Sequence, residues 1–266
     1  MEGEQIKELV RDRYAAVALG NEGCCGSAAT PREASCGMGY SDTELASVPE
    51  GANLGLGCGN PQTLAAMQPG EIVVDLGSGA GFDCFLAAQR VGAYGRVIGV
   101  DMTHEMLKRA RDNAARTGVA NVEFRLGEIE HLPIGDDAAD VVISNCVINL
   151  VPDKEQVYRE AFRVLKPGGR IAISDVVNIT PLPPELATDD ALLCGCMAGA
   201  AASGQIEDWL AAAGFVEIRT TVRPESRELV ESWAPGRGIE DYVASAMIEA
   251  RKPAGAALTS VCRAAR

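Results

Sequence analysis

Apolar residues along this chain fall into two alternating patterns. Short runs rich in valine and isoleucine, each bounded by glycine or a charged residue, predict buried β-strands. Longer segments repeat their apolar residues at spacings of three and four, which predicts amphipathic helices. The strands are predicted at 71–76, 96–101, 122–126, 140–144 and 170–175, and the helices among them at 81–91, 103–117 and 154–165.

The order of these elements indicates the fold class. Strand, helix and strand in succession imply right-handed crossovers, a parallel sheet and helices on both of its faces. We therefore predict an α/β fold with a Rossmann-like, doubly wound and mostly parallel sheet. Ligands of such sheets bind at the carboxyl ends of the strands.

Two further regions flank the predicted sheet. Before it, residues 4–19 carry a helical stripe, and residues 20–39 predict an irregular loop because they are rich in glycine, serine and alanine. Ser41 and Glu44 have the spacing of a capping box at a helix start. After the sheet, the pattern predicts helices at 186–200 and 206–213 and strands at 216–222 and 242–250. We expect an N-terminal cap and a C-terminal α+β extension.

The overall charge limits the partners of the chain. Its 37 acidic and 24 basic residues give a formal net charge of −13, which repels nucleic acid and anionic membrane surfaces. No apolar run reaches the roughly eighteen residues of a membrane span, and the N-terminus lacks the apolar core of an export signal. We therefore expect a cytoplasmic protein whose nine cysteines are reduced, with neither nucleic acid nor membrane as a partner.

One glycine-rich loop carries the first candidate chemistry. The segment from Asp75 to Gly81 (DLGSGAG) stands between a predicted strand and a predicted helix, where glycines let the backbone approach a ligand. A dinucleotide-binding fingerprint needs glycine where this chain has Phe82. Asp75 can hold a cationic amino group, so the loop favours a different nucleoside cofactor.

The ends of the next two strands complete the predicted cofactor site. Asp101 can accept hydrogen bonds from two ribose hydroxyls or can cap the helix that follows it, and Met102 offers an apolar face to adenine. Glu128 and Ile129 place an acid and an aliphatic group at the adenine edge. Over residues 71–177 the chain resembles class I S-adenosylmethionine-dependent methyltransferases. The resemblance implies cofactor contacts by Asp75, Gly77, Ser78, Gly79, Gly81, Asp101, Met102, Glu128, Ile129 and Asn145.

The predicted cofactor site divides the chain into three expected regions. Residues 1–60 would form an N-terminal helix and a cysteine-bearing loop, and residues 61–178 the S-adenosylmethionine-binding Rossmann-like domain. Residues 179–266 would bind the substrate and complete the sheet.

The residues available for catalysis indicate the methyl acceptor. Methylation of oxygen or nitrogen generally uses a base, yet the only two histidines, His104 and His131, stand at predicted surface positions. Cys146 ends the fourth strand and should face the cleft, although a packed strand-end thiol is the alternative. A chain poor in bases and rich in thiols fits an acceptor that has its own lone pair.

The other cysteines have different contexts. Cys58 lies in a glycine-dense stretch that suits a backbone bent around a bound ion. Cys194 and Cys196 are two positions apart in a predicted helix, so at most one of them should face the site. Cys84, in a predicted helix, is expected in the core, and Cys262 in the C-terminal tail.

Three segments resemble the arsenite methyltransferase family. They are residues 55–61 (GLGCGNP), 144–154 (SNCVINLVPDK) and 196–200 (CMAGA), and the second is the most specific. Trivalent arsenic prefers three thiolates and keeps a lone pair that can attack a sulfonium methyl group without a base. The resemblance implies transfer of methyl groups from S-adenosylmethionine to thiolate-bound trivalent arsenic, in arsenic detoxification.

The same resemblance assigns roles to individual cysteines. Cys58, Cys146 and Cys196 would bind the arsenic of arsenite or methylarsenite, and no resident metal ion is expected. A further family cysteine, which takes part in disulfide formation during turnover, would correspond to Cys24 or Cys25. Methylation oxidises arsenic by two electrons, so turnover should need a thiol reductant such as glutathione or thioredoxin.

Two other functions compete with this interpretation. A methyltransferase for a quinone or another small organic acceptor would need a base and a wide apolar pocket, with the cysteines as core residues. A non-catalytic, thiol-rich protein that binds arsenic or zinc would not need the Asp75 loop or Asp101. No Cys-x-x-Cys pair of the kind that binds zinc is present.

Overall fold

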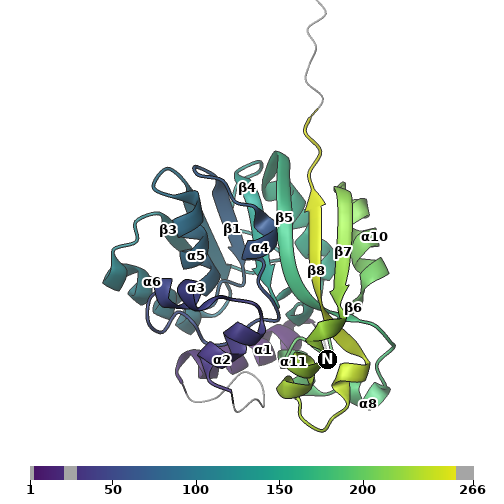
Figure 1. The fold of residues 1–266 in the computed structure, drawn as a ribbon. Coiled ribbons are helices and arrows are strands. Elements are labelled where there is room, and N and C mark those ends of the chain that lie inside the picture. Colours follow the sequence, from purple (N-terminus) through teal and green to yellow (C-terminus); the bar gives the residue numbers. More distant parts are fainter. Residues whose placement is uncertain (1–2, 21–28, 256–266) are drawn as a thin grey trace, which may run out of the picture.

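The chain folds around one mixed β-sheet (Figure 1). The computed structural model describes residues 3–20 and 29–255, and within them the sheet has eight strands in the order β3-β2-β1-β4-β5-β8-β7, with short β6 beside β5. The strands β1 to β5 are parallel, whereas β8 runs antiparallel to both β5 and β7. The predicted α/β fold is therefore confirmed. The strands are β1 (Ile72–Leu76), β2 (Arg96–Asp101), β3 (Val122–Leu126), β4 (Ala139–Asn145), β5 (Leu165–Asn178), β6 (Ala201–Ala202), β7 (Val216–Arg223) and β8 (Val243–Arg251).

Helices cover both faces of the sheet and the carboxyl ends of its parallel strands. The longer helices α5, α6, α7 and α10 alternate with the strands along the chain. Helix α1 lies across the strand ends, together with the short helices α2, α8 and α11 (Figure 1). The α-helices are α1 (Gly3–Ala18), α2 (Pro31–Gly37), α3 (Asp42–Ser47), α4 (Gln62–Ala65), α5 (Phe82–Val91), α6 (His104–Thr117), α7 (Lys154–Val164), α8 (Pro184–Ala187), α9 (Asp190–Cys194), α10 (Ser203–Ala213) and α11 (Arg227–Trp233). Short 3₁₀ turns are η1 (Ile148–Leu150), η2 (Pro224–Ser226) and η3 (Ile239–Asp241).

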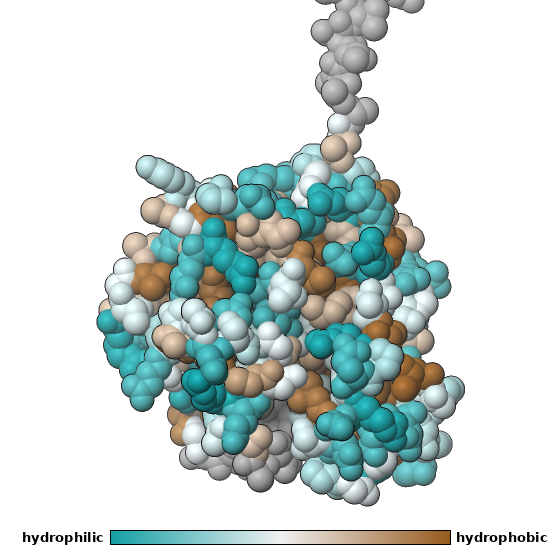
Figure 2. Space-filling view, in the orientation of Figure 1, coloured by the Kyte–Doolittle hydropathy of each residue, from teal (hydrophilic) through white to brown (hydrophobic). Residues whose placement is uncertain are grey.

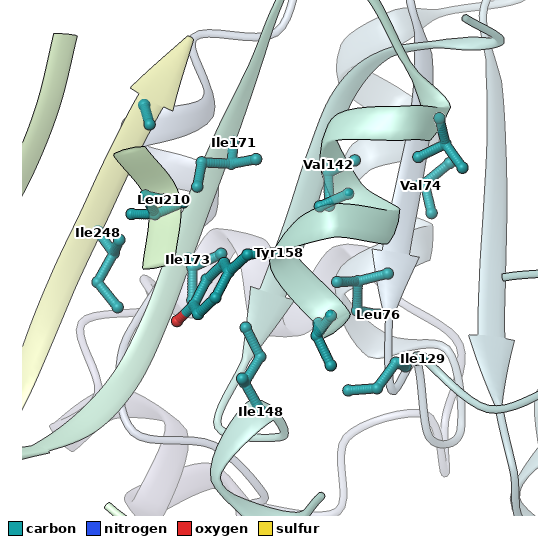
Figure 3. Packing of buried hydrophobic residues seen from close by; sticks show 14 of the residues in the cluster. Val74, Leu76, Ile129, Val142, Ile148, Tyr158, Ile171, Ile173, Leu210 and Ile248 are labelled. Atoms are coloured by element: carbon teal, nitrogen blue, oxygen red, sulfur yellow. The ribbon is translucent and has the colours of Figure 1, made fainter. Parts of the chain in front are cut away.

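The core is divided between the two faces of the sheet. Side chains alternate along a strand, so Val73 packs into the cluster that contains α5 and α6, and Val74 packs into the cluster that contains α7 and α10. In the second cluster the Tyr158 ring lies beside Ile173 of β5 (Figure 3). Each such buried side chain contributes roughly 1.5–3 kcal/mol to stability. The two clusters hold the strand ends, and with them the site, in fixed positions.

Two predicted elements differ from the structure. Residues 20–39, predicted as an irregular loop, include α2, because Thr30 and Glu33 form a capping box and Pro31 starts the helix. The helix predicted at 186–200 is also wrong, because it breaks into α8, α9 and a turn that has Cys196 at φ +65°. Helix α11 was not predicted from the pattern of apolar residues. By contrast, the capping box of Ser41 and Glu44 is confirmed at the start of α3.

The surface agrees with the acidic composition. Figure 2 shows a face that is mostly hydrophilic, with hydrophobic residues in small separate groups. Among the helices in the described part of the chain, none is both long enough and apolar enough to cross a bilayer.

Candidate active site

A cavity of about 500 Å³ opens at the carboxyl ends of the parallel strands. Its walls come from the turns after β1, β2, β3 and β4, from α1 of the N-terminal region, and from α11 of the C-terminal region. Eight of the ten predicted cofactor residues line it, and so do two of the three predicted arsenic ligands. They are Asp75, Gly77, Ser78, Gly79, Asp101, Met102, Ile129, Asn145, Cys146 and Cys196.

Two buried carboxylates, both predicted to contact the cofactor, line the cavity. Asp75 is the penultimate residue of β1, and burial, followed by the charge of Asp83, raises its pKa well above the ordinary value. Burial also raises the pKa of Asp101, although its carboxylate accepts hydrogen bonds from the backbone N–H groups of Gly79 at 2.9 Å and Thr103 at 2.8 Å. Asp101 therefore organises the glycine loop and the start of α6 while it faces the cavity.

The glycine loop is tightly packed and leaves polar groups for a ligand. Gly77 has φ +68°, and a Cβ there would lie 2.4 Å from Cγ2 of Val147, so any side chain would displace the turn after β4. The buried Ser78 hydroxyl lines the cavity and has no hydrogen-bond partner among the described residues. A hydroxyl without a partner and two buried acids fit a ligand with an amino group and ribose hydroxyls.

Two predicted cofactor residues lie elsewhere. Gly81 is the N-cap of α5, and its Cα faces the rings of Phe85 and Phe124 rather than the cavity. The Glu128 carboxylate is 2.6 Å from Nζ of Lys7 on α1, outside the cavity wall. The buried Glu130 lines the wall instead, and sequence analysis missed it because the loop after β3 has no periodicity.

The three predicted ligand cysteines lie together, with Cys146 interacting with each of the other two. Cys58 comes from the loop before α4, Cys146 follows β4, and Cys196 follows α9. Hydrogen bonds from Cys196 and Cys58, in that order, raise the pKa of the Cys146 thiol well above its ordinary value. The Cys196 thiol also donates to the Cys146 carbonyl at 2.7 Å. The thiol of Cys146 thus interacts with two cysteines from distant parts of the chain, Cys58 and Cys196.

Two of these cysteines have unusual backbone angles. Cys146 has φ +58° and Cys196 has φ +65°, in the left-handed region that side chains generally disfavour. Each turn redirects the chain instead of continuing the strand or helix that precedes it, and the Cys196 turn brings its thiol to the Cys146 carbonyl. Strain of this kind is concentrated at functional sites.

Asn145 connects the thiols with the N-terminal region. Its side-chain oxygen accepts a hydrogen bond from the Cys58 N–H at 3.0 Å, and its amide donates to the Gly59 carbonyl at 2.9 Å. The same amide contacts the hydroxyl of buried Tyr40, which donates to Asp83 at 2.8 Å. The side chain of Asn145 therefore fixes the Cys58 loop beside Cys146.

A buried carboxylate that sequence analysis missed lies behind the thiols. A carboxylate oxygen of Asp175, on β5, and the sulfurs of Cys58 and Cys146 all lie within 4.8 Å of one another. Burial raises the pKa of Asp175 to about 7, while nearby Lys154 counteracts the rise. The sequence held a signal, because Asp75 and Asp101 also stand near the carboxyl ends of strands.

The remaining described cysteines and both histidines lie outside the group formed by Cys58, Cys146 and Cys196. Cys84 is buried as predicted, but its thiol also donates to Asp75 at 3.2 Å, so it supports the cofactor side. Cys194 is buried and does not line the cavity. His104 and His131 are exposed, as predicted. Cys24, Cys25 and Cys262 lie outside the described residues.

Comparisons with known proteins agree with this geometry. A methyltransferase-domain family model matches residues 67–214. An arsenite methyltransferase of Halobacterium salinarum is 50% identical over 264 residues, which is 94% of this chain and 68% of that protein. An arsenite methyltransferase of Aquipseudomonas alcaligenes is 46% identical over 170 residues, 61% of this chain and 49% of that protein. The chain therefore spans about two thirds of the first relative and about half of the second.

A solved structure extends the similarity to three dimensions. The crystal structure of an arsenic(III) S-adenosylmethionine methyltransferase from Chlamydomonas reinhardtii matches with a TM-score of 0.58 and 33% identity, over 84% of this chain and 73% of that one. A phosphoethanolamine N-methyltransferase of Haemonchus contortus matches with a TM-score of 0.62 but 21% identity, which shows the fold alone. The chain therefore belongs to the arsenite methyltransferase family, and its methyl donor is S-adenosylmethionine.

Proposed function

We propose that this chain transfers the methyl group of S-adenosylmethionine to trivalent arsenic held by Cys58, Cys146 and Cys196. The observation that carries the proposal is the interaction of the Cys146 thiol with both Cys58 and Cys196, beside a cavity that two buried carboxylates also line. The family relationship and the named activity of the relatives support the same reaction. Its product would be a methylated arsenical in arsenic detoxification.

The cofactor side assigns roles to individual residues. Asp75 would receive the amino group of the methionine portion, with its carboxylate oriented by the thiol of Cys84. Asp101 would accept the ribose hydroxyls, while Met102 and Ile129 pack against adenine. Ser78 and the glycines around it would contact the ligand through the loop.

The chemistry follows from the ligand set. Arsenite and three thiols give a neutral tris-thiolate and three water molecules, so no net proton is released. The arsenic lone pair then forms the arsenic–carbon bond, while the sulfonium sulfur keeps the electrons of the bond that breaks. Arsenic is oxidised from the trivalent to the pentavalent state, and alignment in a water-poor pocket carries much of the catalysis.

Turnover would then need a two-electron donor. A dithiol that becomes a disulfide returns arsenic to the trivalent state, and we propose glutathione or thioredoxin as the external source. One of Cys24 and Cys25 would take part in this exchange. Gly20 and Ala29, which precede and follow the segment with these cysteines, both line the cavity.

The test uses purified full-length protein with arsenite, S-adenosylmethionine and glutathione or thioredoxin. We expect methylated arsenic, and we expect Cys146→Ser and Cys196→Ser to abolish it without changing the affinity for S-adenosylhomocysteine. Cys36→Ser is the matched control, because Cys36 is exposed on α2 and does not line the cavity. Cofactor binding without methylated arsenic would sink the proposal, and full activity of Cys146→Ser would overturn the ligand assignment.

A further inference from the structure

Asp175 has the geometry of a functional residue but no role in the reaction described so far. It is 2% exposed, and a carboxylate oxygen lies within 4.8 Å of the sulfurs of both Cys58 and Cys146. Burial of a charge at such a position is costly unless the charge is paired or hydrogen-bonded. A buried acid that only filled space would be replaced by an apolar side chain at less cost.

Three donors hold this carboxylate in place. It accepts hydrogen bonds from the backbone N–H of Ile148 at 3.0 Å, from the side-chain amide of Asn149 at 2.8 Å and from the backbone N–H of Val176 at 2.8 Å. Donors of this kind stabilise the ionised form of a carboxylate. They also fix its position, because two of them belong to η1, which directly follows Cys146 and Val147.

Methyl transfer moves a positive charge toward these thiols. Before the step the sulfonium carries one positive charge and the arsenic tris-thiolate is neutral. After the step the thioether is neutral and the methylated arsenic, still bound to three thiolates, carries the positive charge. A fixed negative charge on the arsenic side therefore stabilises the transition state more than the reactants, which is the condition for acceleration.

We propose that the Asp175 carboxylate, held behind Cys58 and Cys146, stabilises the positive charge that develops on arsenic during methyl transfer. The inference rests on the proposed arsenic methylation and deepens it. Asp175 is the acid on the acceptor side, because its carboxylate lies within 4.8 Å of the sulfurs of Cys58 and Cys146, whereas Asp75 and Asp101 line the cavity beside the glycine loop. Among the described charged groups, Lys154 faces Asp175 and Cys196 and so opposes this field.

The test separates binding from the methyl-transfer step in the full-length protein. Arsenite and S-adenosylhomocysteine affinities are measured by titration, the first through the ultraviolet absorption of arsenic–thiolate bonds. Methyl transfer is then followed in a single turnover at about pH 8.5, above the pKa of about 7 of the Asp175 carboxyl, with arsenite and S-adenosylmethionine both saturating and no reductant present. We expect Asp175→Asn to keep both affinities and to lower the single-turnover rate constant about 100-fold. Asp175→Glu, which keeps the charge, should recover part of the rate.

Two further variants control for fold and for sign. Glu160→Gln makes the same change at another buried carboxylate, on α7 and outside the cavity wall, and should leave the rate constant unchanged. Lys154→Gln removes the opposing cation. Because Lys154 also lowers the pKa of Asp175, the comparison is made at about pH 8.5, where the rate constant should rise, and this keeps the test decisive if Asp175→Asn does not fold.

The outcomes divide cleanly. An unchanged single-turnover rate constant in Asp175→Asn overturns the inference. A weaker arsenite affinity with an unchanged rate constant at saturation does so too, because that would mean a structural role in forming the thiol site. A slower Lys154→Gln with unchanged affinities also overturns it. If the unmodified protein forms no methylated arsenic in the single turnover, it is the proposed function that fails.

Discussion

Cys146 and Cys196 show at the scale of single residues how a ligand site opposes local preference. Their positive φ angles are compatible with glycine but costly for a side chain, by roughly 1–2 kcal/mol each. Sequence analysis could predict the cysteines, because their motifs resemble a known family. It could not predict the backbone angles, because the helical periodicity around Cys196 pointed to a continuous helix.

The strain at Cys146 can be measured by a pair of substitutions. Cys146→Gly and Cys146→Ala both remove the thiol, but only glycine accepts φ +58° freely. We expect the glycine variant to be more stable by about 0.5–1 kcal/mol in urea denaturation, after allowance for the greater entropy of unfolded glycine. The same pair at Cys84, inside helix α5, should show the opposite order. Equal stability of the two Cys146 variants would mean that the turn is not strained.

The raised pKa of Asp175 leads to a second prediction at this scale, about how the stability of the protein depends on pH. Burial raises its pKa from 3.8 to about 7 in the folded protein, so between these values the folded state holds its proton more tightly than the unfolded state does. The contribution of this group to stability is therefore complete below about pH 4 and is lost as the pH rises through about 7.

Asp175→Asn should remove this dependence. The stability of the unmodified protein relative to the variant should fall by up to about 1.4 kcal/mol per pH unit between about pH 4 and 7. Urea denaturation of both proteins across this range measures the difference. A difference that stays constant with pH would contradict the raised pKa.

At the scale of elements, the sequence predicted that α1 is a helix but not where it packs. Its amphipathic stripe gave the helix correctly, but the partners of that stripe come from remote parts of the chain. Nζ of Lys7 lies 2.6 Å from Glu128 and 3.4 Å from buried Glu130, in the turn after β3. The Arg109 guanidinium donates to the Ala18 carbonyl at 2.9 Å, at the other end of the helix. These contacts hold α1 over the cavity.

Removal of the Lys7 ammonium should loosen α1. Lys7→Ala leaves the Glu130 carboxylate buried without this cation, which is destabilising. We expect the amides of α1 to exchange with deuterium about 10-fold faster, while those of β4 and β5 keep their rates. Lys108→Ala is the control, because Lys108 pairs with Asp112 on the exposed side of α6. If both variants give the same exchange in α1, the contact does not hold the helix.

At the scale of the whole molecule, the sheet crosses the boundary that sequence analysis placed after residue 178. Strand β8 pairs with β5 from Arg251 opposite Arg170 to Val243 opposite Asn178. The apolar patterns predicted both strands. They could not predict that the two strands pair, because the pairing of segments so far apart in sequence is decided by the packing of the complete sheet. Two of the three regions expected from sequence, 61–178 and 179–266, therefore share one sheet, whereas the described part of residues 1–60 adds no strand to it. Whether either of these two regions folds alone is a question for experiment.

A chain that ends after Asn178 provides that test. It exposes the β5 edge and the apolar side chains of Ile171 and Ile173, which β8 and α10 cover in the complete protein. We expect this fragment to aggregate or to unfold without a cooperative transition in circular dichroism. A chain that ends after Gly255 keeps every contact described above and should unfold cooperatively. A cooperative transition of the shorter fragment would show that residues 179–255 are dispensable for folding.

One contact of β8 also sets the order in which the molecule can be completed during translation. The hydroxyl of Ser245 donates to the carbonyl of Cys58 at 2.7 Å, so one of the three converging cysteines is anchored to the last strand of the sheet. A nascent chain emerges from the ribosome with its glycine loop and Asp101 long before Ser245. The thiol cluster is consequently assembled later than the glycine loop and Asp101, once β8 has left the ribosome.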